Sequence, residues 1–268
     1  MKNLKISQIQ FQAKAKPDDN CNQLESYYKK ALKFRPDIIC TPECSNIITN
    51  DKKHLFKFST YQNECPILSM SKNFAKRHKL FINIGSLLLK VKNENKLINR
   101  SFIIDKNGSI NSFYDKIHMF DVKISSNEYY KESDSFKPGK KLKSFKFKNT
   151  KIGLTICYDL RFPNLFRKLA KKGAELILMP AAFTATTGKD HWEILVRARA
   201  IENNAYLIAT NMCGTHHTNR KTYGHSLLVD PWGRVLNRAI NKPKILNTTI
   251  DLRKVKKDRN KIPSLSHD

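Results

Sequence analysis

The sequence lacks long apolar runs and has few cysteines. No run reaches the roughly 18 apolar residues of a membrane span, and the first residues alternate polar and apolar side chains, unlike a signal peptide. The six cysteines of the 268 residues are too few and too irregularly spaced for a disulfide scaffold. We therefore expect neither membrane association nor export, but a location in a reducing cytoplasm.

Acidic residues are also scarce, since 23 of them face 50 basic residues, for a net charge of +27. Of the basic residues, 38 are lysine, which recognises phosphates and bases less specifically than arginine does. The lysines are scattered along the chain rather than gathered on one segment. The charge favours a solvated surface that attracts small anionic substrates, with no nucleic-acid partner. A nucleic-acid-associated basic protein is the alternative, and it requires a steep salt dependence of DNA retention.

No repeat and no linker rich in Pro, Gly or Ser divides the chain, and 40% of its residues are hydrophobic. Strand and helix patterns alternate, which predicts one α/β domain over residues 1–268 with a peripheral basic tail from about residue 252. The expected strands cover about 3–11, 38–40, 80–89, 101–105, 110–114, a segment ending at 156, 174–179 (closed by Pro180), 205–211, 223–229, 234–239 and 245–250. One expected helix begins near residue 18, and three others cover about 66–78, 163–172 and 189–203. Residues 118–141 are expected to form a long loop.

Three reactive side chains lie where a predicted strand or hairpin gives way to a loop, namely Glu43, Lys116 and Cys157. Strand ends are where α/β folds place reactive groups. Taken singly, each has a plainer interpretation: a solvated loop carboxylate, one surface lysine among many, and a buried inert thiol. Spacing alone does not bring them together.

The sequence around these residues resembles the nitrilase superfamily of carbon-nitrogen hydrolases over almost its whole length. Three blocks carry the resemblance, at residues 41–43 (TPE), 114–121 (YDKIHMFD) and 153–163 (GLTICYDLRFP). The resemblance implies that Glu43 is a general base, Lys116 a stabilising cation, Cys157 the nucleophile and Glu132 a further glutamate beside the site. Thr41 stands where leucine is commoner in the family, and the Glu43 carboxylate is kept.

Amide hydrolysis needs a nucleophile, a base and a pocket that stabilises an oxyanion, and these residue types can supply all three. Glu43 would take the thiol proton as Cys157 attacks the amide carbon, and the Lys116 ammonium and the main-chain N–H of Tyr158 would hold the oxyanion. Ammonia would leave a thioester, which water hydrolyses. Glu132 would orient the ammonium and balance its charge. This chemistry needs no metal and no cofactor.

A metal site is a weak alternative. Cys213, His216, His217 and His225 lie close together in the sequence, but their spacing fits no familiar zinc pattern. A loop at the mouth of the pocket is the favoured interpretation.

The downstream half resembles the superfamily's amidases that act on α-keto acid amides. The loop 213–226 resembles the deaminated-glutathione amidases, which implies a small anionic amide substrate, with an ω-amidase acting on α-ketoglutaramate or α-ketosuccinamate as the alternative. A catalytically inactive binding protein is a further alternative. The candidate substrate-binding residues are Tyr158, Arg161, Phe183, His216, His217 and Arg220, and Arg197 and Arg199 are further candidates for binding a carboxylate.

The same resemblance implies a four-layer α-β-β-α sandwich of two sheets of the six-stranded type. It also implies a homodimer or higher homo-oligomer, assembled through the face that carries the helix at about 189–203.

Overall fold

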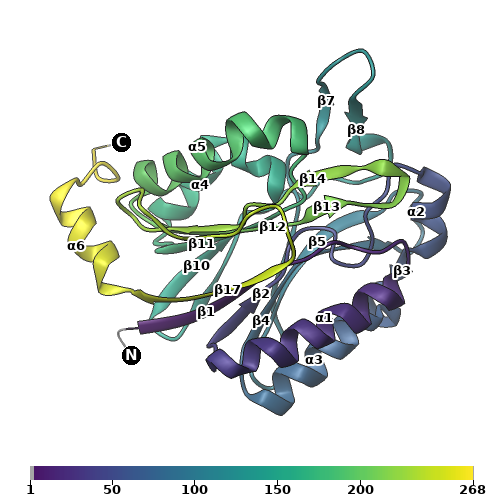
Figure 1. Ribbon diagram of the computed structural model, residues 1–268. Helices are drawn as coiled ribbons and strands as arrows, with labels where there is room; N and C mark the ends of the chain where they lie inside the picture. Colours follow the sequence, from purple (N-terminus) through teal and green to yellow (C-terminus); the bar gives the residue numbers. More distant parts are fainter. Residues whose placement is uncertain (1–2, 268) are drawn as a thin grey trace.

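Two β-sheets lie face to face at the centre of the molecule, and helices cover both outer faces (Figure 1). The computed structural model describes residues 3–267, so Met1, Lys2 and Asp268 of the predicted 1–268 domain lie outside the described residues. The order of layers, helix, sheet, sheet and helix, confirms the predicted α-β-β-α sandwich.

The first sheet has seven strands, namely β1 (Asn3–Gln10), β2 (Ile38–Cys40), β3 (Thr60–Tyr61), β4 (Phe81–Lys90), β5 (Ile98–Ile104), β6 (Ile110–Asp115) and β17 (Lys244–Asp251). Their order is β17-β1-β2-β4-β5-β6, and β3 pairs with β4. Strands β1, β2 and β4 are parallel, and two antiparallel pairings return β6 to the same direction. The segments that follow β2 and β6 therefore leave the sheet at the same edge.

The second sheet has six strands, namely β9 (Lys143–Phe147), β10 (Thr150–Leu154), β11 (Leu176–Ala181), β12 (Tyr206–Asn211), β15 (Leu227–Val229) and β16 (Val235–Arg238). Their order is β16-β15-β12-β11-β10-β9, and β10, β11 and β12 are parallel. The segments that follow β10 and β11 share one edge of this sheet.

Two helices cover each sheet. Helices α1 (Pro17–Ala31) and α3 (Pro66–His78) pack on the first sheet, and α4 (Pro163–Lys171) and α5 (Ala185–Asn203) on the second (Figure 1). The remaining elements are α2 (Lys52–Phe58), α6 (Arg253–Lys261), the hairpins β7 (Asp121–Lys123) with β8 (Tyr129–Lys131) and β13 (Cys213–Thr215) with β14 (Lys221–Tyr223), and the 3-10 turns η1 (Leu32–Phe34), η2 (Gln62–Glu64), η3 (Glu132–Asp134), η4 (Cys157–Arg161) and η5 (His217–Asn219). No helix within residues 3–267 is long and apolar enough to cross a membrane.

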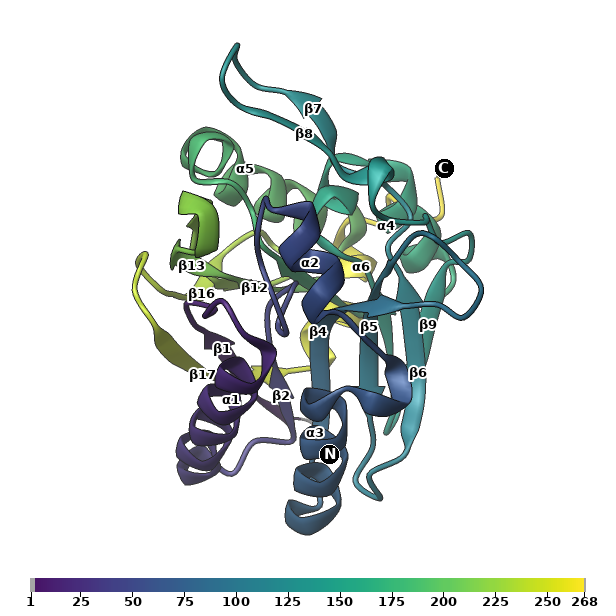
Figure 2. The same cartoon turned by 90° about the vertical axis from the view of Figure 1, so that its right-hand side faces the viewer.

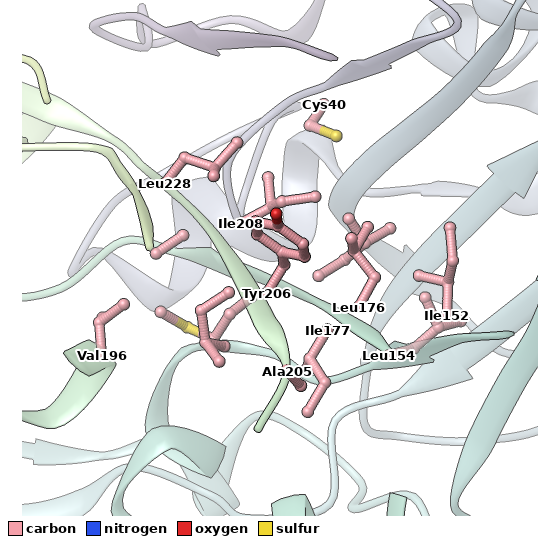
Figure 3. Close-up of a cluster of buried hydrophobic side chains, with 14 of the residues drawn as sticks. Cys40, Ile152, Leu154, Leu176, Ile177, Val196, Ala205, Tyr206, Ile208 and Leu228 are labelled. Atoms are coloured by element: carbon pink, nitrogen blue, oxygen red, sulfur yellow. The ribbon is translucent and has the colours of Figure 1, made fainter. Parts of the chain in front are cut away.

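The side-chain alternation of β1 shows how the layers are held together. Leu4 and Ile6 belong to the apolar cluster shared with the second sheet, whereas Ile9 belongs to the cluster under α1 and α3. Figure 3 shows part of the shared cluster, with Cys40 of the first sheet lying above Ile208 of the second. Burial of these side chains from both sheets is the main stabilising contribution that joins the layers.

Helix α3 matches the predicted range 66–78, and its ends explain why. Pro66 occupies the first turn, where its fixed φ suits the helix and no N–H is needed. Lys79, the residue after the helix, is in the left-handed region with φ 53°, which ends the helical path.

Strand β11 continues through Pro180, whereas the sequence pattern predicted that Pro180 closes it. In this strand, the carbonyl of Leu178 faces β10 and that of Ala181 faces β12. The nitrogen of Pro180 therefore faces β10, which has already ended at Leu154. No ladder hydrogen bond is lost, so the proline is tolerated.

Two other expectations differ from the structure. The strand predicted over 223–229 is split into β14 and β15, because Gly224 and His225 both have positive φ, 67° and 52°. The loop predicted over 118–141 contains the β7–β8 hairpin, which projects from one end of the molecule (Figures 1 and 2).

The basic tail from about residue 252 forms α6, which lies outside both sheets at one end of the molecule (Figure 1). Val255 is fully buried, and Arg259 donates a hydrogen bond to the carbonyl of Ala174. A few apolar and hydrogen-bonding positions thus dock a helix whose other faces stay solvated.

Candidate active site

Four segments meet at one end of the sandwich and bring together Glu43, Lys116, Glu132 and Cys157. Glu43 follows β2, Lys116 follows β6, and Cys157 follows β10, all at strand ends. Glu132 opens η3, directly after the β7–β8 hairpin. The common direction of the strands explains how positions far apart in sequence converge.

Lys116 lies at the centre of this group and contacts both carboxylates. Its Nζ is 2.9 Å from Oε1 of Glu43, and 2.9 and 2.8 Å from the two carboxylate oxygens of Glu132. Lys116 and Glu43 are only 2% and 3% exposed. Burial lowers the pKa of Lys116, but the carboxylates of Glu132 and Glu43 outweigh it and raise that pKa well above its usual range, so the side chain stays an ammonium.

Glu43 is surrounded by hydrogen-bond donors. Besides Lys116, Asn99 Nδ2 donates to Oε1 at 2.9 Å, and the main-chain N–H of Ala182 donates to Oε2 at 2.8 Å. Burial raises the pKa of Glu43, yet the Lys116 ammonium and hydrogen bonds from Lys116, Cys157 and Ala182 outweigh burial and lower it below its usual value. Glu43 is therefore ionised at neutral pH.

Cys157 carries its proton while the site is at rest. Burial and the adjacent Glu43 carboxylate raise the pKa of the thiol well above its usual range, and the Lys116 ammonium offsets only part of this. The thiol and the carboxylate of Glu43 lie side by side in the lining of one cavity. A protonated thiol beside an ionised carboxylate is the arrangement that general-base catalysis with a thiol nucleophile requires.

The backbone at Cys157 has φ 46°, in the left-handed region that residues other than glycine rarely adopt. Asp159, which is fully buried, supports this turn: its carboxylate accepts from the N–H of Ile156 at 2.8 Å and from the hydroxyl of Tyr114 at 2.8 Å. The same carboxylate is 2.7 Å from Nδ1 of His118. Asp159 thus links the turn that carries Cys157 to the segment that carries Lys116.

The loop that carries Glu43 is bound closely to β4. The hydroxyl of Thr41 accepts from the N–H of Gly85 at 3.0 Å, so this replacement of the commoner leucine anchors the loop. A side chain at Gly85 would lie 2.0 Å from the carbonyl oxygen of Thr41 and 2.4 Å from that of Pro42. Only glycine allows this approach.

Glu132 is oriented from the opposite side. Its Oε2 accepts from the main-chain N–H of Phe120 at 2.7 Å, and its Oε1 lies 3.4 Å from Nδ2 of Asn99. The glutamate therefore links the hairpin segment to the ammonium.

A cavity of about 520 Å³ opens above the four side chains and is large enough for a small organic substrate. Three of the predicted substrate-binding residues, Tyr158, Phe183 and Arg220, line it. The guanidinium of Arg220 lies 5.5 Å from the centre of the Tyr130 ring, and its Nε is buried without a hydrogen-bond partner among residues 3–267.

The other three predicted substrate-binding residues, Arg161, His216 and His217, lie outside the lining of this cavity. Arg161 contacts Nδ1 of His191 at 3.1 Å and lies 5.3 Å from the Phe183 ring centre.

The two histidines have partners of their own. Nε2 of His216 lies 2.7 Å from the Thr222 hydroxyl, and burial lowers the pKa of His216 to about 4, so it is neutral at pH 7. His217 stacks on His54 with ring centres 4.2 Å apart.

Two further arginines named as carboxylate binders support the fold. Nε of Arg197 donates to the carbonyl of Gly233 at 2.9 Å, and Nε of Arg199 to that of Leu160 at 3.0 Å. Both bonds tie α5 to neighbouring segments.

The residues of the alternative metal site each have other neighbours. Nδ1 of His225 lies 2.6 Å from the carbonyl oxygen of Tyr223, and Cys213 is buried in β13. Across the described residues, no group of three or more His, Cys, Asp or Glu side chains is arranged to hold a metal ion.

Two residues were not singled out from the sequence: Asn99, which contacts Glu43 and Glu132, and Asp159, which supports the turn that carries Cys157. Asp159 stands two residues after Cys157, inside a block already quoted, so its position was a usable signal. Asn99 precedes the strand predicted at 101–105, and nothing in the local pattern marks it.

Comparison with known proteins places the chain among enzymes of one kind. A family model described as carbon-nitrogen hydrolase matches residues 5–260. A deaminated glutathione amidase from Yersinia enterocolitica is 35% identical over 270 residues, covering 100% of this chain and 94% of the relative. The omega-amidase NIT2 of Mus musculus is 33% identical over 267 residues, covering 99% and 95%. The crystal structure of the C. elegans NitFhit protein superposes with a TM-score of 0.93 at 31% identity, and this chain spans 65% of that one.

Proposed function

The chain belongs to the carbon-nitrogen hydrolase family, and we propose that it is an amidase that uses Cys157 as nucleophile, Glu43 as general base, Lys116 as stabilising cation and Glu132 as the anchor of that cation. One observation carries the proposal: a single buried ammonium contacts both carboxylates, and the Cys157 thiol lies beside one of them, that of Glu43.

In the first half of the reaction, Cys157 attacks the amide carbon and its proton passes to Glu43. The negative charge that develops on the amide oxygen is stabilised by the Lys116 ammonium and the main-chain N–H of Tyr158. The C–N bond then breaks, Glu43 returns the proton to the departing nitrogen, and ammonia leaves a thioester on Cys157.

In the second half, Glu43 takes a proton from a water molecule that attacks the thioester carbonyl. The C–S bond breaks, the proton returns to the sulfur, and the carboxylic acid product leaves. One carboxylate thus acts as base and acid in both halves. Glu132 keeps the ammonium in place because its two oxygens bind Lys116 throughout.

We propose deaminated glutathione as the substrate, an α-keto acid amide with a peptide tail that ends in a carboxylate. The names of relatives at about 35% identity support this choice, as does Arg220, a cation in the cavity lining. α-Ketoglutaramate or α-ketosuccinamate is the second candidate, supported by the mouse omega-amidase relative.

Release of ammonia from a panel of amides tests the proposal. The panel contains deaminated glutathione, α-ketoglutaramate, α-ketosuccinamate and an N-carbamoyl compound, with Cys157→Ala as the control. We expect the first compound to give the highest kcat/KM. No release from any of them would instead favour the inactive binding protein.

We also propose that the protein is a homodimer or a higher homo-oligomer in a reducing cytoplasm. Five large apolar side chains are exposed on α5 and around the neighbouring β16, namely Ile194, Ile201, Trp232, Leu236 and Ile240. An exposed apolar surface of this kind is typical of an interaction face. All six cysteines are free thiols, which suits a reducing compartment.

A further inference from the structure

Asn99 contacts two members of the reactive group, which consists of Glu43, Lys116, Glu132 and Cys157. It lies near the start of β5, is 2% exposed and lines the cavity. Its Nδ2 lies 2.9 Å from Oε1 of Glu43 and 3.4 Å from Oε1 of Glu132. Lys116 binds these same two oxygens, and its main-chain N–H donates to the carbonyl of Asn99 at 3.0 Å.

The other end of the Asn99 amide has no hydrogen-bond partner. Its Oδ1 is buried and unpaired in the part of the chain that the structure describes, whereas buried polar atoms nearly always have a partner. The reverse orientation would place Oδ1 against two carboxylate oxygens, where the contacts repel. Among residues 3–267, the two glutamates are therefore the hydrogen-bond partners that orient this amide.

Asn83 on the adjacent β4 shows the contrasting case. It is 1% exposed, and its Nδ2 donates to the hydroxyl of Ser101 at 3.1 Å and to the carbonyl of Phe102 at 3.2 Å. These contacts join two strands and involve no member of the reactive group. Asn83 is thus a matched control for a buried asparagine.

We infer that Asn99 is a positioning residue, whose amide N–H groups hold Glu43 and Glu132 on either side of the Lys116 ammonium and so fix the Glu43 carboxylate beside the Cys157 thiol. The inference rests on the proposed function, in which Glu43 is the base. A neutral donor suits this position because it binds two carboxylates without adding a second positive charge. A second cation would compete with the Lys116 ammonium for the Glu43 carboxylate.

Removal of this donor has a consequence that a loss of packing does not have. The ionisable groups that face Glu43 are Lys116, Glu132, Cys157 and Cys44. A hydrogen bond to the ionised carboxylate favours ionisation, so its loss raises the pKa of Glu43. Because the base acts only when ionised, the acidic limb of the pH profile moves to higher pH, by about one unit.

The test compares Asn99→Ala, Asn99→Asp and Asn83→Ala. Asn99→Asp keeps the shape of the side chain but replaces the donor by a third carboxylate, so it guards against a folding failure of Asn99→Ala. Two profiles are measured against pH: kcat with the preferred amide, and the rate at which iodoacetamide labels Cys157, which needs no substrate.

Both Asn99 variants are expected to move the acidic limb of both profiles upward by about one unit and to lower kcat on the order of 10-fold. Asn83→Ala is expected to lower stability without moving either limb. The inference is overturned if the limbs of the folded Asn99 variants coincide with those of Asn83→Ala.

Glu43→Gln separates this inference from the function on which it rests. It should lower kcat for ammonia release on the order of 100-fold or more, because the Cys157 thiol loses its base. Unchanged ammonia release by Glu43→Gln would contradict Glu43 as the base, and the inference with it. Lost release in Glu43→Gln together with unmoved limbs in the Asn99 variants would contradict the inference alone.

Discussion

One ammonium, that of Lys116, lies between two carboxylates where little solvent reaches, so each member of the reactive group depends on the others. Removing one partner of a buried ion pair leaves an uncompensated charge, which is costly even where the intact pair contributes little. At the scale of single residues, the predictions therefore concern substitutions that impair the chemistry, and removal of Lys116 is expected to lower stability as well.

The first prediction concerns Cys157. Cys157→Ala should abolish ammonia release, and Cys157→Ser should leave only traces, because a carboxylate base is matched to a thiol and poorly matched to an alcohol. Single-turnover assays measure both. Iodoacetamide should label Cys157 first, because Cys157 lines the cavity beside Glu43, whereas Cys40 is buried outside the cavity lining and burial raises the pKa of the half-buried Cys21 to about 11. Substantial turnover by Cys157→Ala would exclude the thiol as nucleophile.

The second prediction concerns the shape of the cation. Lys116→Arg should lose on the order of 100-fold or more in kcat, almost as much as Lys116→Ala, because a planar guanidinium cannot replace a compact ammonium held between two carboxylates within 2.9 Å. Steady-state kinetics of both variants provide the test. If Lys116→Arg keeps most of its activity, any positive charge suffices there.

The third prediction concerns substrate choice. Arg220→Ala should lower kcat/KM on the order of 10-fold or more for deaminated glutathione and change it little for α-ketoglutaramate, because the shorter amide does not reach the remote cation. Arg238→Ala, which removes a surface arginine paired with Glu193, is the control. Equal losses for both substrates would contradict a remote carboxylate subsite at Arg220.

At the scale of elements, the site depends on how closely the loop after β2 approaches β4. Thr41 and Pro42 present main-chain oxygens to Gly85, and the side chain of Pro180 from the second sheet lies close to the same point. Main-chain atoms cannot move away as a flexible side chain can. The position of Glu43 is thus set by a contact among three segments.

The fourth prediction follows from this contact. Gly85→Ala should lower the free energy of unfolding by about 3 kcal/mol or more, because the added carbon would lie 2.0 Å from a carbonyl oxygen. Gly153→Ala in β10, whose nearest new neighbour is a side-chain atom of Leu169 at 3.1 Å, should cost clearly less. Urea denaturation compares the two. Equal losses would mean that the loop shifts freely.

At the scale of the whole molecule, apolar side chains from both sheets form one continuous cluster, and we propose on this basis that residues 1–268 fold as one domain.

The apolar face on α5 is a separate feature. Ile194 and Ile201 stand two turns apart on one side of the helix and are 69% and 51% exposed, which is costly in a monomer.

The fifth prediction is that this face forms a subunit interface. Ile194→Asp combined with Ile201→Asp should convert a dimer or larger assembly to a smaller species, since charges in an apolar interface are strongly unfavourable. Light scattering after size exclusion measures the mass. Tyr61→Asp, an exposed site on β3, should leave the mass unchanged. A monomeric wild-type protein would contradict the prediction.

The sequence by itself determined the alternation of strands and helices, because hydrophobic periodicity and turn residues are local signals. It also placed Glu43, Lys116 and Cys157 at strand ends, and the resemblance predicted the sandwich that the structure confirms. Local signals misjudged Pro180, whose tolerance depends on where the neighbouring strand stops.

Only the tertiary structure decided which side chains meet. Arg220 lines the cavity while His216 and His217 lie behind it, although the three are close together in the sequence. Asn99 reaches both glutamates because antiparallel pairing sets the start of β5 beside the end of β6. The pairing of β5 with β6 follows from a local hairpin, but the approach of Glu43 and Glu132 to Asn99 depends on the packing of segments far apart in the chain, which no local pattern records.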